Sequence, residues 1–85
     1  MRYRLPSHAQ EEVGRRQIPL ALVESVLEEP DQVVAERGAV KAYQSKRDIG
    51  GKMFFVRVMV DDSLDPAVVV TAYRTTRIDR YWKKP

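Results

Sequence analysis

Apolar residues recur at helical spacing in the first third of the chain. The motif SHAQ at residues 7–10 has the form of a capping box, with Ser7 as the N-cap, and predicts a short helix over residues 8–16. After a break at Ile18-Pro19, the segment PLALVESVLEE places leucine and valine on one face. This pattern predicts a second helix over residues 19–29.

Beyond Asp31 the pattern changes to the alternation typical of strands. Strands are predicted at residues 32–36, 39–45, 52–61 and 67–75, with a glycine-containing loop at 47–51. Short turns join these strands, so neighbours along the chain should pair antiparallel. We therefore predict an α+β fold in which two N-terminal helices pack on one face of a four-stranded antiparallel sheet. Residues 1–6 form either a short leading strand or an arm.

Period-two alternation divides the strand side chains between the two faces of the sheet. The apolar set Phe54, Val56, Val58 and Val60 should meet the helices, and on the last strand Val68, Val70 and Ala72 share one face. The other face can carry a polar set from three strands: Lys41, Tyr43, Arg57, Thr71 and Tyr73. Whether these side chains converge depends on the strand order, which the pattern leaves open.

Size and composition narrow the function classes. The chain has 85 residues, which predicts a single domain over 1–85 with a basic C-terminal tail from about residue 76. It has no cysteine, which excludes zinc ribbons, iron–sulfur sites and cysteine enzymes. No metal-binding or cofactor-binding motif is evident, and we expect neither a metal nor a cofactor. No apolar run approaches the roughly 20 residues of a membrane helix, so we expect a cytoplasmic protein without membrane contact.

Positive charge is concentrated at the end of the chain. Residues 74–85 hold five basic residues against Asp79, a balance of +4, while the whole chain carries +3. The basic residues of this segment are Arg74, Arg77, Arg80, Lys83 and Lys84. Such asymmetry suggests an anionic partner, either nucleic acid or an acidic protein, although a solvated tail explains it equally well.

These residue types allow RNA cleavage without a metal. That chemistry needs a proton acceptor for the 2′-hydroxyl and positive charge to stabilise the phosphorane. The candidates for positive charge are Lys41, Arg57, Arg74 and Arg77, and those for proton transfer are Tyr43, Tyr73 and His8. Each also has a plainer interpretation, since tyrosines suit strands and a lone histidine at a helix start is often only solvated.

Several short motifs resemble a known family. They are Ser7-His8-Ala9, Arg15 or Arg16 before Ile18, Leu27-Glu28-Glu29-Pro30 and Val70-Thr71-Ala72-Tyr73. Over about residues 5–82 the chain resembles small bacterial and phage domains of uncharacterised function, which are grouped with the barnase–EndoU–colicin–RelE superfamily of nuclease toxins. The closing TAYRTTRIDRYW resembles one subgroup.

The resemblance implies the same RelE/barnase-like fold and a metal-independent ribonuclease, the toxin of a toxin–antitoxin pair. Carried over by position, His8, Arg16, Thr71 and Tyr73 match the family's site, and RNA and a small antitoxin-like protein are the implied partners. The chain departs from the family at Gln17, where related sequences often have glycine, and it has no second histidine. Any catalysis would then resemble the RelE type, in which basic residues and a tyrosine act.

Two hypotheses result. In the first, the domain cleaves or binds RNA, with His8, Arg16, Lys41, Arg57, Thr71 and Tyr73 as catalytic candidates. In this hypothesis Tyr43, Arg74, Arg77 and Arg80 contact the RNA. In the second, the chain is a non-catalytic interaction module whose basic C-terminal segment binds an acidic protein or nucleic acid.

Overall fold

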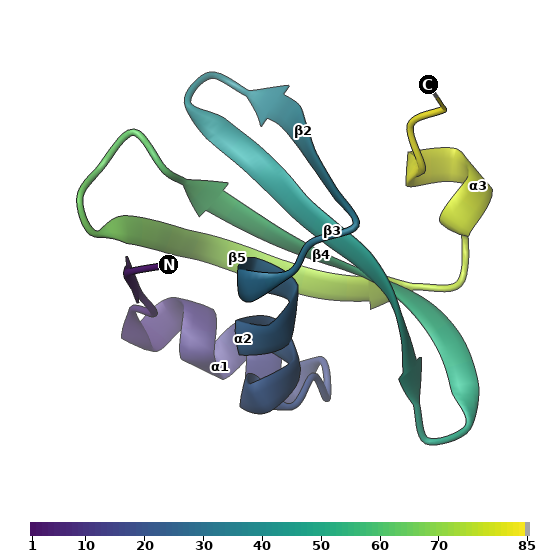
Figure 1. Ribbon diagram of the computed structural model, residues 1–85. Coiled ribbons are helices and arrows are strands. Elements are labelled where there is room, and N and C mark those ends of the chain that lie inside the picture. Colours follow the sequence, from purple (N-terminus) through teal and green to yellow (C-terminus); the bar gives the residue numbers. More distant parts are fainter. Residues whose placement is uncertain (85) are drawn as a thin grey trace.

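The computed structural model describes residues 1–84 and shows one curved sheet with helices on both sides (Figure 1). The elements are β1 (Tyr3–Arg4), α1 (Ser7–Arg15), α2 (Leu20–Glu28), β2 (Gln32–Arg37), β3 (Val40–Ile49), β4 (Lys52–Asp61), β5 (Ala67–Thr75) and α3 (Ile78–Tyr81). Among these residues, no helix is both long enough and apolar enough to cross a membrane.

The sheet differs from the sequence prediction. Its strand order is β1-β5-β4-β3-β2, and β1 pairs parallel to β5 while the remaining pairs are antiparallel. The α+β class is confirmed, but the prediction of a four-stranded antiparallel sheet with two helices is wrong. The structure has a five-stranded mixed sheet and a third helix. The extra strand, β1, is only two residues long and lies within residues 1–6, where a short leading strand was one of the two alternatives predicted. The sequence of that segment marks neither its partner nor its direction.

Helices α1 and α2 pack against one face of the sheet. Val13, Val23 and Val26 are fully buried there against Val56 and Val58 of β4. We call this side the helix face and the opposite side the far face.

The predicted capping box is absent. Pro6 is the N-cap of α1 and Ser7 is already helical, with no side-chain hydrogen bond at the cap. The Gln10 side chain instead donates to the carbonyl of Leu5 at 2.9 Å. Proline already has φ near the value that starts a helix, so the backbone enters α1 without the serine.

The turn at the end of α1 is one that glycine would form with less strain than Gln17. The amide of Ile18 donates to the carbonyl of Val13 at 3.0 Å, and that of Gln17 to Gly14 at 3.1 Å, which is a Schellman motif. Gln17 occupies the left-handed position of that motif with φ 56°. Glycine adopts this conformation without strain, whereas glutamine keeps the same turn at some cost.

A β-bulge in β5 changes which residues face the core. Met59 lies opposite Thr71 but Val60 lies opposite Val69, so Val70 is the extra residue. Val69 and Ala72 are therefore both buried on the helix face, while Val70 is 45% exposed. The predicted face shared by Val68, Val70 and Ala72 is wrong for this reason.

The register of β3 separates the predicted polar set. Gln44 lies opposite Arg57, and Tyr43 lies opposite Val58. Directly opposite residues share a face, so Lys41 and Tyr43 belong to the side of Val58, away from Arg57. Strand β3 also runs on to Ile49, and the predicted five-residue loop shrinks to a Gly50-Gly51 turn with φ of 62° and 88°.

The C-terminal segment folds back over the far face. Trp82 packs edge-on against the fully buried Phe55, with ring centroids 5.9 Å apart. The backbone of Tyr81 and Lys83 accepts hydrogen bonds from Gln44 and Gln32 of neighbouring strands. In Figure 1, α3 lies on the side of the sheet opposite α1 and α2. The predicted tail is therefore a cover for the far face, with its basic side chains directed to solvent.

Candidate functional site

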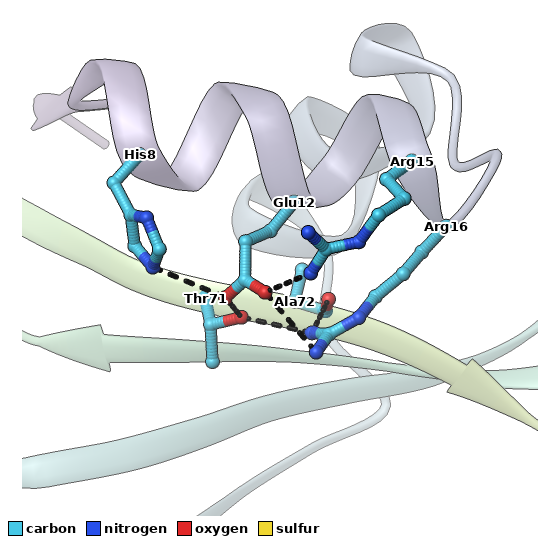
Figure 2. A network of polar contacts seen from close by, with 6 residues as sticks. All are labelled: His8, Glu12, Arg15, Arg16, Thr71 and Ala72. Carbon is cyan, nitrogen blue, oxygen red and sulfur yellow. Dashed lines mark hydrogen bonds and ion pairs between the residues drawn. The ribbon is translucent and has the colours of Figure 1, made fainter.

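Four side chains meet where α1 crosses the free edge of β5 (Figure 2). They are His8, Glu12 and Arg16, from successive turns of α1 and its C-cap, and Thr71 of β5. We call this group the α1–β5 site. Residues four apart share a helix face, so His8, Glu12 and Arg16 form one row along α1. Strand β1 pairs only with Ala67 and Val68, which leaves the edge of β5 beyond them free to receive that row.

The carboxylate of Glu12 is the centre of the site. One oxygen accepts a 2.9 Å hydrogen bond from the Thr71 hydroxyl and lies 3.5 Å from Nε2 of His8. The other oxygen lies 3.2 Å from Nη2 of Arg16 and 2.6 Å from Nη2 of Arg15. A single carboxylate thus brings together an imidazole, a hydroxyl and two guanidinium groups.

Arg16 joins the helix to the strand. Its Nη1 donates to the Thr71 hydroxyl at 3.0 Å and to the carbonyl of Ala72 at 2.9 Å. The second bond satisfies a carbonyl on the unpaired edge of β5 and protects that edge from pairing with another chain. The Arg16 side chain remains 37% exposed, so solvent and ligands reach part of the guanidinium.

The electrostatics favour an anionic Glu12 beside accessible positive charge. The Thr71 hydrogen bond lowers the pKa of Glu12 below its ordinary value, and the charges of Arg16, His8 and Arg15 act in the same direction against partial burial. The Glu12 side chain is 14% exposed, whereas that of His8 is 78% exposed. The carboxylate is therefore a charged anchor, while the imidazole is open to solvent.

A second polar network lies on the far face around Arg57, which is 3% exposed. Its Nε donates to Gln44 at 2.8 Å, its Nη2 donates to Glu36 at 2.9 Å, and its Nη1 donates to the Tyr73 hydroxyl. The guanidinium also lies over the Tyr81 ring, 4.4 Å from its centroid. We call this group the Arg57 network.

Burial perturbs both ionisable centres of the Arg57 network. Burial works against the charge of Arg57, but its hydrogen bonds to Tyr73 and Glu36 outweigh that effect and raise the pKa of the guanidinium. Burial also raises the pKa of the Tyr73 phenol, which Arg57 opposes and Tyr81 reinforces. Arg57 is thus a permanent cation, and its Nε, Nη1 and Nη2 atoms all donate hydrogen bonds within the protein.

The sequence-predicted residues therefore fall into separate groups. His8, Arg16 and Thr71 converge at the α1–β5 site, and Arg57 and Tyr73 lie directly opposite each other on the far face. Thr71 lies opposite Met59 and therefore also borders the far face, so it contributes to both the α1–β5 site and the far face.

The other predicted residues lie elsewhere. Lys41 and Tyr43 both contact Asp62, at 3.2 and 2.8 Å, and the Tyr43 hydroxyl lowers the pKa of that carboxylate. Arg74 bonds Gln17 at 3.2 Å and stacks on Phe54. Arg77 and Arg80 are exposed at α3. These five residues do not form one site.

The residues predicted from the sequence did not include Glu12, Glu36, Gln44 and Tyr81. Glu12 carried a signal, because it lies four residues from both His8 and Arg16 on a predicted helix. Glu36 and Gln44 gave none, since only the pairing of β2 with β3 and of β3 with β4 brings them to Arg57. No group of three or more histidine, aspartate or glutamate side chains within residues 1–84 is placed to hold a metal ion.

Comparison with known proteins identifies a family whose function is unknown. The family model described as a domain of unknown function (DUF4258) matches residues 5–74, most of the chain. No curated protein and no solved structure matches the chain. The matched segment includes the whole α1–β5 site and the Arg57 network apart from Tyr81.

Proposed function

We propose that this chain, which belongs to the DUF4258 family of domains of unknown function, cleaves RNA without a metal at the α1–β5 site. One observation carries the proposal. The only histidine of the sequence is exposed beside a carboxylate that also holds Arg16 and Thr71, on elements far apart in the chain. An exposed imidazole and a guanidinium on either side of one carboxylate are a pairing suited to phosphodiester chemistry.

The proposed reaction uses the 2′-hydroxyl of RNA as the nucleophile. The neutral imidazole of His8 accepts its proton, and the 2′-oxygen attacks the adjacent phosphorus. The bond from phosphorus to the 5′-oxygen breaks, giving a 2′,3′-cyclic phosphate and a 5′-hydroxyl that takes its proton from solvent. Arg16 neutralises the charge of the phosphorane, and Glu12 holds His8 and Arg16 in position.

Membership of the wider nuclease toxin superfamily and pairing with an antitoxin-like protein are part of this proposal. An antitoxin would block the site by covering the exposed imidazole of His8.

The test is expression in a bacterial host, followed by growth and by the integrity of bulk mRNA. We expect growth arrest and mRNA decay with the natural chain and neither with His8→Asn. Glu12→Gln should also relieve the arrest, whereas Glu11→Gln, on the exposed neighbouring position of α1, should not. Normal growth with intact mRNA at high soluble expression of the natural chain would reject the proposal.

One observation favours a second function, a non-catalytic interaction module. The Arg57 network is closed within the protein, and α3 presents Arg77 and Arg80 outward. Such a surface suits an acidic protein partner. In the growth experiment this function predicts unchanged growth. The chain purified from those cells should retain an acidic protein partner, and Arg77→Glu should release that partner.

A further inference from the structure

A pocket of about 360 Å³ opens on the far face beside the α1–β5 site. Its floor is apolar and consists of Val40, Met59 and Val70, while Glu36, Arg37 and Tyr73 line its polar side. The volume lies at the lower end of the range for small-molecule sites and is large enough for a nucleobase. Val70 is in this position because of the bulge in β5.

Thr71 connects the pocket to the site. Thr71 lines the pocket, and its hydroxyl donates a hydrogen bond to Glu12 at 2.9 Å. A ligand in the pocket therefore lies next to the groups to which we assign phosphate chemistry. In an RNA strand, a base and its own 3′-phosphate are separated by only one ribose, which matches two neighbouring subsites.

The polar side of the pocket presents a defined pattern of hydrogen-bonding groups. Arg57 donates from Nη1 to the Tyr73 hydroxyl and from Nη2 to Oε2 of Glu36, so one guanidinium holds both groups side by side. Arg37 lies next to Glu36 in the sequence and also lines the pocket, and its guanidinium carries N–H donors. The Glu36 carboxylate is an acceptor. The pocket therefore offers a donor next to a carboxylate.

Guanine is the base whose edge complements this pattern. It presents one acceptor, O6, followed by two adjacent donors, N1–H and the N2 amino group, and a carboxylate accepts two such donors in parallel. Adenine and cytosine present a single amino donor on that edge, and uracil places its one N–H between two carbonyls. The apolar floor suits the flat face of a base.

We propose that this pocket binds a guanine base of RNA and thereby selects the phosphate placed at the α1–β5 site. The assignment of that phosphate rests on the proposed function, whereas binding of guanine in the pocket does not require cleavage. Arg57 acts here as a positioning residue that orients Glu36 and Tyr73.

The test is titration of the full chain with guanosine, adenosine, cytidine and uridine 3′-monophosphates, followed by amide chemical-shift mapping. We expect guanosine monophosphate to bind roughly 10-fold or more tightly than the other three, with shifts at the pocket residues. Val70→Trp fills the pocket from an exposed position and should abolish that preference. Val33→Trp is the matched control, because Val33 is equally exposed, at 45%, on strand β2 and lies outside the pocket.

Glu36→Gln provides the second variant and should remove the preference for guanine while leaving weak, unselective binding. Equal affinity for all four nucleotides, or undiminished guanosine monophosphate binding by Val70→Trp, would overturn the inference. Guanine-selective binding without RNA cleavage would support the pocket and reject only the proposed function. Cleavage with no preference for guanine would reject the pocket alone.

Discussion

Arg57→Ala should cost a large share of the stability of the domain. The substitution removes three hydrogen bonds and the stacking on Tyr81, and it leaves the buried amide oxygen of Gln44 without its donor. Leaving a buried polar group such as Gln44 without its hydrogen-bond partner typically costs about 1–3 kcal/mol, and the lost bonds to Tyr73 and Glu36 add to that cost. At roughly 0.05–0.15 kcal/mol per residue, a chain of this length has only about 4–13 kcal/mol in total.

The assay is urea denaturation followed by the fluorescence of Trp82, the single tryptophan, which packs directly on the far face. The control is Arg77→Ala, an exposed arginine at the N-cap of α3, which should change stability by less than about 0.5 kcal/mol. A loss below about 1 kcal/mol for Arg57→Ala would refute the reasoning and show that the Arg57 network is dispensable for folding.

Three further predictions follow from the structure. Gln17→Gly should raise the free energy of unfolding by about 0.5–1 kcal/mol in urea denaturation, because it relieves the left-handed backbone at φ 56°; a decrease would contradict this. Trp82→Ala should lower it by about 2 kcal/mol, because the far face over Phe55 loses its cover, and a change under 0.5 kcal/mol would argue against a packed C-terminal segment. The pKa of Glu12 is lowered in the folded state, so its contribution is present above the ordinary glutamate pKa and is lost as the pH falls through the folded value. Glu12→Gln should therefore flatten the acid side of the stability–pH curve, while an unchanged slope would show that Glu12 has no favourable partners.

Local patterns predicted most of the elements. The helical spacing of Leu20–Glu28 and the alternation of Lys52–Asp61 placed the second helix and the central strand nearly as observed. The apolar face of Val56, Val58 and Val60 was also correct. These features depend on side-chain periodicity within one segment, which the sequence expresses directly.

Features that depend on pairing between segments could not be predicted. The extra residue at Val70 reverses the faces of β5, and no local signal marks it. The register of β3 placed Gln44, rather than Tyr43, opposite Arg57. Both alternating sets of side chains on that strand mix polar and apolar residues, so the sequence did not show which set faces the helices. The fold-back of α3 depends on a contact between Trp82 and Phe55, which lie on different elements. The candidate site was consequently predicted in part: His8, Arg16 and Thr71 converge, whereas Lys41, Tyr43 and Arg74 lie elsewhere.

The most direct test of the α1–β5 site is the rate at which the purified chain cleaves an RNA oligonucleotide in the presence of a metal chelator. His8 is 78% exposed, so His8→Asn should leave the fold intact, which urea denaturation can verify. We expect the natural chain to release products ending in a 2′,3′-cyclic phosphate and to leave a 2′-O-methyl oligonucleotide uncut. His8→Asn should be slower by roughly 100-fold or more. Equal rates for the natural chain and His8→Asn, or no cleavage by either, would contradict the proposal that this site cleaves RNA.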